Sequence, residues 1–292
     1  MQIESLKVFC DLAETESFTK TAQINNVTQS AVSQTISALE REFRSLLVER
    51  SRKHFHLTPE GQVLYDKSKE ITKTFDALET KLKDVKNDIS GKLRIATVYS
   101  IGLHELPPYV RRLLKDYPHV NAHIEYRRSN QVYEDVKSNA VDLGIVAYPN
   151  RDPNLELVSL RKDPLVLICH PQHPFASLKS IKLKALNGQR LISFERDIPT
   201  RRALDRIFKH EGVKAEHFRE FDNIEILKRV VEVDSGVAVV PEPTVRREVA
   251  NGTLVAVPLD GKYSRDLGLI YKKSKVLSPA MKQFITLLKE PL

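Results

Sequence analysis

Apolar residues in the first sixty positions recur every three or four residues, which predicts a series of short helices. The first helix has an apolar face made of Leu6, Phe9, Leu12 and Ala13. Ser17 is a suitable N-cap for a second helix over residues 18–24. The pair Asn25-Asn26 that follows tolerates left-handed backbone, so we expect this helix to end there in a tight turn.

A third helix is predicted to follow, with Thr28 as its N-cap. Its buried face is expected to consist of Val32, Ile36, Leu39 and Phe43. Two helices joined by so short a turn form a helix-turn-helix. The opposite face is polar, and it is either a solvated surface or a set of groups that hydrogen-bond to base edges. It carries Gln29, Ser30, Ser33, Gln34 and Ser37.

The segment 46–58 alternates apolar with basic or polar residues, which predicts a short hairpin, or wing. Its tip carries Arg50, Arg52 and Lys53. Thr58 and Pro59 then supply an N-cap and a first helical residue, so we expect a new helix to begin at this point.

The helix that begins at Pro59 has the most regular apolar pattern in the chain. A heptad seam, interrupted by Ser68, consists of Leu64, Ile71, Phe75, Leu78, Leu82, Val85 and Ile89. Such a seam can pack either on the helix's own domain or on a second copy of the chain. Its narrow width favours the second interpretation, so we expect this seam to be a dimer interface.

From Gly91 onward, apolar runs typical of strands alternate with amphipathic helical segments. The expected strands are 93–98, 123–126, 141–148, 164–170, 190–194, 236–241, 254–259 and 267–271. The expected helices are 106–117, 131–139, 200–212, 225–233, 243–252 and 278–290. This alternation predicts an α/β domain with a mainly parallel sheet, and its length suits two lobes.

The sequence thus predicts a multidomain α+β protein. We expect an all-α winged helix-turn-helix domain over residues 1–58, a linker helix over 59–90 and an α/β domain over 91–292. Within the last, one lobe is expected over about 91–161 and 267–292, and a second over about 162–266.

The formal net charge of +8 is weak evidence for nucleic-acid binding in this chain. The first ninety residues contain 13 Lys and Arg against 14 Asp and Glu, so the positive excess lies beyond the helix-turn-helix. No apolar run approaches the roughly 20 residues that span a bilayer. The N-terminal segment lacks the layout of a signal peptide, so we expect a cytoplasmic location.

The residues most often found in redox, metal and catalytic sites favour none of those chemistries. Cys10 and Cys169 lie in apolar segments and are interpreted as buried reduced thiols, a redox pair being the alternative. His170 and His173 stand beside prolines and are interpreted as a structural turn rather than as metal ligands. The sequence contains no G-x-S-x-G, no H-E-x-x-H and no phosphate-binding glycine loop, so no catalytic residue, metal or cofactor is predicted.

Several longer motifs lie at characteristic spacing along the chain. Residues 17–22 read S-F-T-K-T-A, 28–34 read T-Q-S-A-V-S-Q, 36–40 read I-S-A-L-E and 57–61 read L-T-P-E-G. Residues 141–146 read V-D-L-G-I-V, 170–175 read H-P-Q-H-P-F and 234–241 read D-S-G-V-A-V-V-P. In these motifs the sequence resembles the LysR-type transcriptional regulators over essentially its whole length.

This resemblance implies a winged helix-turn-helix, a dimerising linker helix and a two-lobed effector domain like the type 2 periplasmic binding proteins. It also implies dimers, often paired into tetramers, on promoter DNA. Three positions depart from the family pattern, and one of them is Val48, which stands where Phe is often found. Asn25 stands where Leu is usual, and Arg44 stands where Gly is common, which argues against left-handed backbone at that position.

The polar face of the third helix is therefore interpreted as the DNA reader. Gln29 and Gln34 are expected to contact bases, while Thr28 and Ser30 suit phosphate contacts at the helix start. Ser33 and Ser37 complete this face. Positive charge is expected to come from Lys20, Arg50, Arg52 and Lys53.

Ligands of open α/β sheets bind beyond the carboxyl ends of strands, often at helix starts. Two such places are residues 97–100 and 194–201, and the resemblance puts Ser100 and the Thr200 region at the mouth of an inter-lobe cleft. The candidate effector-binding residues are Thr97, Ser100, Phe194, Arg196, Thr200 and Arg201. The arginines and helix starts favour an anionic small molecule. In the alternative, Thr200 only caps its helix, and the arginines pair with Asp197 and Asp205.

The sequence predicts a DNA-binding transcriptional regulator that responds to a small, anionic effector. Its expected partners are double-stranded promoter DNA, the effector and a second copy of the chain, with RNA polymerase as a further candidate and no membrane. Two alternatives differ in class, namely a constitutive or architectural DNA-binding protein and an α/β enzyme.

Overall fold

The computed structural model describes residues 2–50, 55–85 and 89–290. Its N-terminal domain contains the helices α1 (Ile3–Thr15), α2 (Phe18–Asn25) and α3 (Gln29–Phe43), followed by the antiparallel wing strands β1 (Val48–Arg50) and β2 (Phe55–Leu57). The core of the domain consists of Leu6, Phe9, Leu12, Ala22, Val32, Ile36, Leu39, Leu47 and Val48. The predicted winged helix-turn-helix is thus confirmed.

The helix ends in this domain follow local hydrogen-bond chemistry. Ser17 Oγ accepts a hydrogen bond from the backbone N–H of Lys20 at 3.3 Å, and Thr28 Oγ1 accepts one from that of Ala31 at 3.1 Å. Asn26 has a φ of 54° and ends α2 in the left-handed conformation. The N-caps and the turn expected from the sequence are all confirmed.

Two expectations for this domain are corrected, those for Phe43 and Arg44, and the departure at Asn25 is explained. Phe43 lies in the last turn of α3 and is 42% exposed, because the helix end projects beyond the core. Arg44 does adopt left-handed backbone, with a φ of 53°, and its N–H bonds to the carbonyl of Glu40. Asn25 replaces the usual apolar contact with a polar one, since its Nδ2 donates to Asp11 at 2.9 Å.

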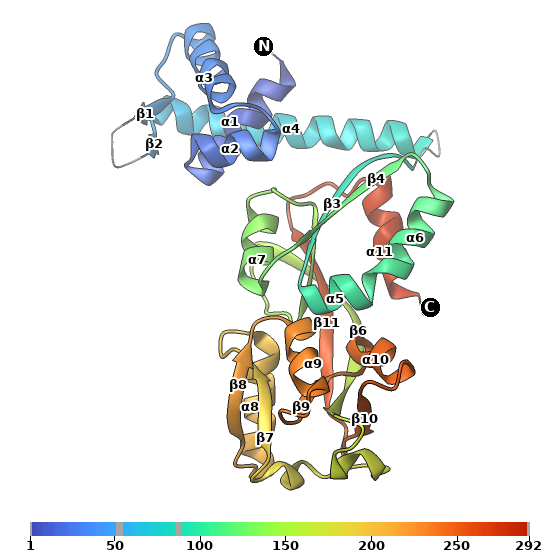
Figure 1. Ribbon diagram of the computed structural model, residues 1–292. Helices are drawn as coiled ribbons and strands as arrows, with labels where there is room; N and C mark the ends of the chain where they lie inside the picture. Colours follow the sequence, from blue (N-terminus) through green and yellow to red (C-terminus); the bar gives the residue numbers. More distant parts are fainter. Residues whose placement is uncertain (1, 51–54, 86–88, 291–292) are drawn as a thin grey trace.

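A single long helix, α4 (Pro59–Val85), connects the N-terminal domain to the rest of the chain (Figure 1). Thr58 fixes its start, because the hydroxyl donates to the carbonyl of Leu46 at 2.6 Å and accepts from the N–H of Gly61 at 2.9 Å. Any other residue at position 61 would clash with the backbone, since a Cβ on Gly61 would lie 2.0 Å from the carbonyl oxygen of Leu47. The first turns of α4 therefore belong structurally to the DNA-binding domain.

The C-terminal domain has two lobes, arranged below α4 in Figure 1. Lobe I contains β3 (Gly91–Thr97), β4 (Val120–Tyr126) and β5 (Leu143–Ala147), with α5 (Tyr99–His104), α6 (Leu106–Asp116), α7 (Ser129–Lys137) and α11 (Pro279–Lys289). Lobe II contains β7 (Arg190–Phe194), β8 (Glu216–Phe221), β9 (Ala238–Pro241) and β10 (Val255–Pro258), with α8 (Pro199–Glu211), α9 (Ile224–Glu232) and α10 (Arg246–Ala250).

Two long strands cross from one lobe to the other. They are β6 (Leu155–Cys169) and β11 (Ser264–Lys272), which pair antiparallel. The strand order of the shared sheet is β10-β6-β11-β5-β3-β4, with β9 also paired to β6. The expectation of a mainly parallel sheet is wrong, because the crossing strands return between the lobes and pair antiparallel with every neighbour.

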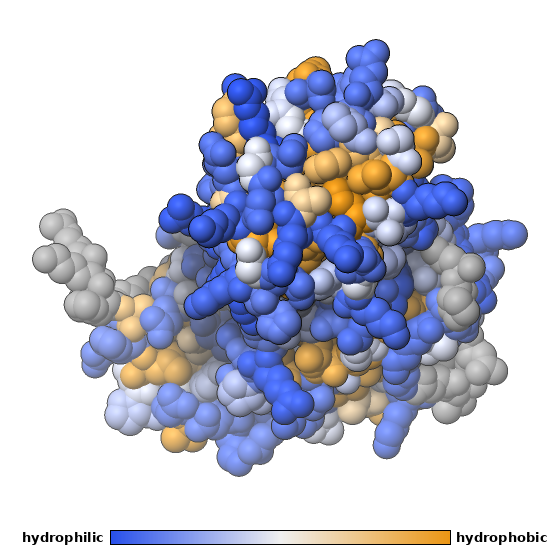
Figure 2. Space-filling model, turned by 90° about the horizontal axis from the view of Figure 1, so that it is seen from below, coloured by the Kyte–Doolittle hydropathy of each residue, from blue (hydrophilic) through white to orange (hydrophobic). Residues whose placement is uncertain are grey.

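Three further elements differ from the expected set. The sequence analysis found neither α5, which is only six residues long, nor β8, whose side chains are mostly exposed and polar. It also found only the second, apolar half of β6. None of the helices within the described residues is long and apolar enough to cross a membrane. Seen from the end of lobe II, hydrophilic side chains cover most of the surface, and apolar ones gather in limited patches (Figure 2).

Candidate DNA-binding face and effector cleft

The outward face of α3 is polar, as expected. Val32, Ile36 and Leu39 are buried on the opposite side, which leaves Ser30 and Gln34 exposed one turn apart. Among the other predicted reader residues, Lys20, Thr28 and Gln29 are exposed, and Ser33 and Ser37 are half-buried. This helix therefore separates a core side from a side that can enter a groove of DNA.

This face also carries a cation, Arg41, that was not predicted from the sequence. Arg41 is exposed and follows Gln34 by seven residues, which is two turns along the same side of α3. Its Nε donates to the carbonyl of Ser37 at 3.3 Å, so the side chain lies back along the helix. Arg41 could have been predicted from its spacing, because it follows Ser30 and Gln34 on the same side of the helix and extends their polar face past Glu40.

The structure describes fewer of the DNA contacts predicted for the wing. The β1–β2 pairing places Arg50 opposite Phe55, so the strands lead toward the predicted basic tip. Arg52 and Lys53 lie outside the described residues, as do the side chains of Arg50 and Val85.

The apolar seam of α4 has two kinds of surroundings. Near its start, Leu64 packs on the core of the N-terminal domain, and Ser68 is fully buried. Further on, Ile71, Leu78 and Leu82 are 46%, 53% and 55% exposed. The first half of the seam therefore packs on its own domain, which was the alternative considered above, while an apolar stripe remains on the second half.

A small cleft lies between the two lobes, with a volume of ≈ 120 Å³. Helices from both lobes begin at its walls, since Ser129 starts α7, Pro199 starts α8 and Ile224 starts α9, with the short α5 beside them. Their N-termini present backbone N–H groups that have no partner within the helix. Such a cleft suits a small ligand with oxygen acceptors.

Three of the predicted effector residues meet in this cleft, and three do not. Ser100, Phe194 and Thr200 line it together. Thr97 is fully buried, with its hydroxyl donating to the carbonyl of Ile145 at 3.2 Å. Arg196 is exposed and outside the cleft lining.

Arg201 is also wrongly predicted as a ligand contact, because its guanidinium holds lobe II together. Nε donates to Asp205 at 2.8 Å, and Nη1 donates to Glu220 at 2.8 Å and to the carbonyl of Phe194 at 2.8 Å. The alternative pairing with Asp205 is therefore confirmed. Thr200 lines the cleft and is not the N-cap of α8, since that position is Ile198.

Arg128, which was not predicted as a site residue, lines the cleft and bridges the two lobes. From lobe I it donates to Glu195 at 3.2 Å, to Asp197 at 3.0 Å and to Asp222 at 2.8 Å, all in lobe II. No local pattern could have identified it, because its partners follow 67 to 94 residues later in the chain.

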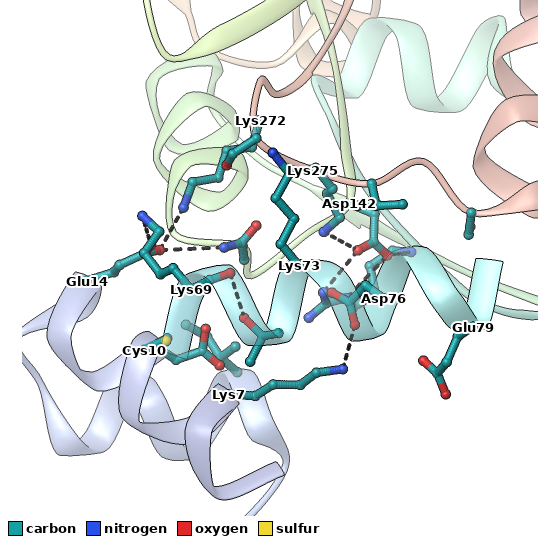
Figure 3. Close-up of a pocket in the computed structure, with 18 of the residues that line it drawn as sticks. Lys7, Cys10, Glu14, Lys69, Lys73, Asp76, Glu79, Asp142, Lys272 and Lys275 are labelled. Carbon is teal, nitrogen blue, oxygen red and sulfur yellow. Dashed lines mark hydrogen bonds and ion pairs between the residues drawn. The ribbon is translucent and has the colours of Figure 1, made fainter. Parts of the chain in front are cut away.

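A second, larger cleft of ≈ 560 Å³ separates the N-terminal domain and α4 from lobe I (Figure 3). Glu14 of α1 lines this cleft and accepts from Lys272 of β11 at 2.7 Å and from Tyr65 at 3.1 Å, with Lys69 of α4 at 3.2 Å. Burial disfavours the charged form of Glu14, but the hydrogen bond and charge of Lys272, reinforced by Lys69, outweigh it and lower the pKa of the carboxyl. The contacts of Glu14 therefore join the N-terminal domain to the C-terminal domain.

Glu14→Gln is expected to lower the free energy of unfolding by about 1–3 kcal/mol near neutral pH, as for a buried hydrogen bond to a charged group. Because the folded-state pKa of Glu14 is lowered, the stability it adds is present above its ordinary pKa and is lost as pH falls through the folded value. The difference from the unaltered protein should therefore stay constant from pH 7 to pH 5 and shrink below the ordinary pKa of 4.5, as chemical unfolding is repeated down to pH 3. Glu79→Gln, an exposed side chain in the same cleft, is the control and should change little. A difference that does not vary with pH would contradict the assignment.

The two cysteines, together with His170 and His173, have structural roles. Burial raises the pKa of Cys10 to about 12 and that of Cys169 to about 11, with nearby carboxylates adding to both shifts. Both thiols are buried and free, one in α1 and one at the lobe II end of β6. His170 and His173 accept hydrogen bonds from backbone N–H groups two residues on, through Nδ1 in each case, and so hold the turn that follows β6 in lobe II.

The geometry defines a class of protein, namely a winged helix-turn-helix regulator that carries a two-lobed ligand-binding domain. Comparison with known families agrees. Residues 3–62 match the model for the bacterial regulatory helix-turn-helix proteins of the lysR family, and residues 86–292 match the LysR substrate binding domain. The chain belongs to the LysR family and is a LysR-type transcriptional regulator with an effector-binding domain.

Individual relatives cover between 68% and 99% of the chain. The HTH-type transcriptional regulator CysL of Bacillus subtilis is 27% identical and covers 99% of this chain and 97% of its own length. Full-length OxyR from Pseudomonas aeruginosa shares the fold, with a TM-score of 0.75, 21% identity and coverage of 99% and 95%. The CcmR regulatory domain of Synechocystis, solved with 2-PG, has a TM-score of 0.63 at 24% identity and covers 68% of this chain and 96% of its own. The relatives carry the names of regulators, which is a non-enzymatic role.

Proposed function

We propose that the effector is a small acid that binds in the cleft between the lobes. The observation that carries this proposal is the convergence of the α7, α8 and α9 N-termini, from both lobes, on one small cleft. Ser100 from lobe I and Thr200 from lobe II both line this cleft, and their hydroxyl groups add hydrogen-bonding capacity. The solved CcmR domain binds 2-PG, so a fold of this kind can hold a small molecule. Because the helix starts attract negative charge, an acid that contacts both lobes would favour their closed arrangement.

We propose further that α3 reads operator DNA through Gln34 and Gln29. Thr28, Ser30 and Lys20 would contact phosphates beside it, with Ser33 and Ser37 on the flank of the same helix. Arg41 joins this set, and the wing residues Arg50, Arg52 and Lys53 remain candidates for anchoring the backbone.

Gln34→Ala is expected to weaken operator binding by about 1–3 kcal/mol and to relax the preference for one base pair, since a bidentate contact to adenine is lost. Gel-shift titrations against operators altered one position at a time would measure both effects. Gln62→Ala, on an exposed turn of α4, is the matched control. Unchanged affinity and unchanged base preference in Gln34→Ala would remove this residue from the reading face.

The exposed half of the α4 seam suits a second copy of the chain, so we propose a homodimer, with pairing into tetramers as an extension. Its contacts would come from Ile71, Leu78 and Leu82, next to Phe75 and to Val85, while Leu64 serves the N-terminal domain. The division into residues 1–58, 59–90 and 91–292 is supported by the starts of α4 at Pro59 and of β3 at Gly91. We place the protein in the cytoplasm, where promoter DNA is found, with RNA polymerase as a further partner.

A further inference from the structure

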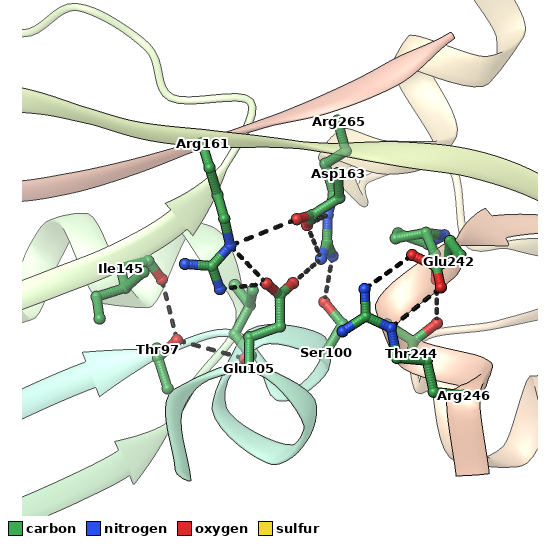
Figure 4. Close-up of polar contacts among 12 residues, drawn as sticks. Thr97, Ser100, Glu105, Ile145, Arg161, Asp163, Glu242, Thr244, Arg246 and Arg265 are labelled. Carbon is green, nitrogen blue, oxygen red and sulfur yellow. Dashed lines mark hydrogen bonds and ion pairs between the residues drawn. The ribbon is translucent and has the colours of Figure 1, made fainter. Parts of the chain in front are cut away.

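Two arginines and two carboxylates form a cluster where β6 and β11 cross between the lobes, and all of them except the half-buried Arg161 are buried (Figure 4). Arg265 and Asp163 are partners in the two strands, and Nε and Nη2 of Arg265 donate to Asp163 at 3.0 and 2.6 Å. Nη2 also donates to Glu105, between α5 and α6, at 2.8 Å. Arg161 donates to the other oxygen of Glu105. Arg265 is completely buried, so these contacts compensate its charge.

The remaining nitrogen of Arg265 points to the effector cleft. Its Nη1 donates to Ser100 Oγ at 2.8 Å, and Ser100 lines the cleft. A guanidinium carries donors only, so the oxygen of Ser100 is the acceptor in this contact. The hydrogen of the Ser100 hydroxyl must therefore point elsewhere, and no group within the described residues accepts it.

We propose that Arg265 is a positioning residue of the effector site, which orients the Ser100 hydroxyl as a hydrogen-bond donor toward the bound molecule. This inference rests on the proposed function and narrows the ligand class. The ligand atom that faces Ser100 is an oxygen acceptor, as in a carboxylate or phosphate. An ammonium or amide N–H at the same place would leave the hydroxyl hydrogen without an acceptor.

The contact can be tested without knowing the effector, because a cysteine in place of Ser100 reports its neighbours through its pKa. A donor at hydrogen-bond distance stabilises a thiolate and lowers the thiol pKa from its usual value of about 8.5. Cys10 and Cys169 are buried, with pKa values raised to about 12 and about 11, so they do not interfere. Glu105 and Asp163, the two carboxylates beside Arg265, both already pair with it.

The experiment uses the full chain with Ser100→Cys, and with Thr200→Cys as the matched control on the facing wall of the same cleft. Arg201, the neighbour of Thr200, is fully engaged within lobe II, so no arginine is directed at the control position. The rate of alkylation by iodoacetamide is measured from pH 5 to pH 10. We expect the midpoint for Ser100→Cys to lie at least one pH unit below that for Thr200→Cys, which means about tenfold more thiolate at low pH.

Adding Arg265→Lys to Ser100→Cys should raise the midpoint toward that of the control, because the ammonium cannot reach both carboxylates and position 100. An equal or higher midpoint for Ser100→Cys than for Thr200→Cys would overturn the proposal, and this comparison stands even if Arg265→Lys does not fold. An unchanged midpoint in a folded Arg265→Lys variant would overturn it as well. A cleft that binds no small acid would contradict the proposed function but would leave the titration unaffected.

Discussion

Leu78→Asp is expected to preserve the fold and to reduce affinity for the operator at least about a hundredfold. Leu78 is 53% exposed in the single chain, so the substitution leaves the core intact. On the seam of α4 it would place a desolvated charge between two helices, which disfavours their association. A dimer binds two half-sites at once, and the second contact multiplies affinity by about 10²–10⁴.

Sedimentation of the variant should show monomers, and gel shifts should show nearly equal affinity for a full operator and a half-site. Val63→Asp makes the same chemical change on α4, on an exposed side chain roughly a quarter turn away from the seam, and serves as the control. A Leu78→Asp protein that remains dimeric would show that α4 is not the dimer interface.

Ser100→Ala and Thr200→Ala are each expected to abolish the response to effector at concentrations that saturate the unaltered protein, while DNA binding is retained. Each removes one hydroxyl from the cleft, and a hydrogen bond to a charged ligand group contributes about 1.5–3 kcal/mol. Effector affinity should therefore fall roughly tenfold to a hundredfold, which calorimetry on the full chain can measure.

Thr97→Val is the control for these two variants, because the Thr97 hydroxyl bonds to the carbonyl of Ile145 and lies outside the cleft. It should lower the melting temperature and leave the effector response intact. An effector response that survives in both Ser100→Ala and Thr200→Ala would contradict the assignment of the cleft.

The helix starts and the buried face of α3 could be predicted from the sequence, because they depend on residues close together in the chain. Ser17 and Thr28 cap helices through side chains only three residues from their partners, and Thr58 does the same for α4. The apolar spacing of α3 likewise identified its buried side, since three of the four predicted residues are buried. Phe43 differs because periodicity describes a face and carries no information about where the neighbouring elements stop.

The effector domain was harder to predict because its decisive contacts join distant segments. Arg265 meets Glu105 across 160 residues, and Arg128 meets Asp222 across 94. Arg201 looked like a ligand contact because it stands at a helix start, yet its carboxylate partners satisfy it inside lobe II. The pairing of β11 with β6 also reverses the expected strand direction, and only the fold as a whole determines that.

The central claim, that a small acid in the inter-lobe cleft controls DNA binding, is tested most directly by footprinting the full-length protein on its promoter. The footprint would be compared with and without each acid that raises the melting temperature in a thermal-shift screen. We predict protection of two separated half-sites, and a change in their extent or affinity of about fivefold or more with at least one acid. A footprint of the same extent and affinity with every metabolite tested would contradict the account and would indicate a constitutive DNA-binding protein.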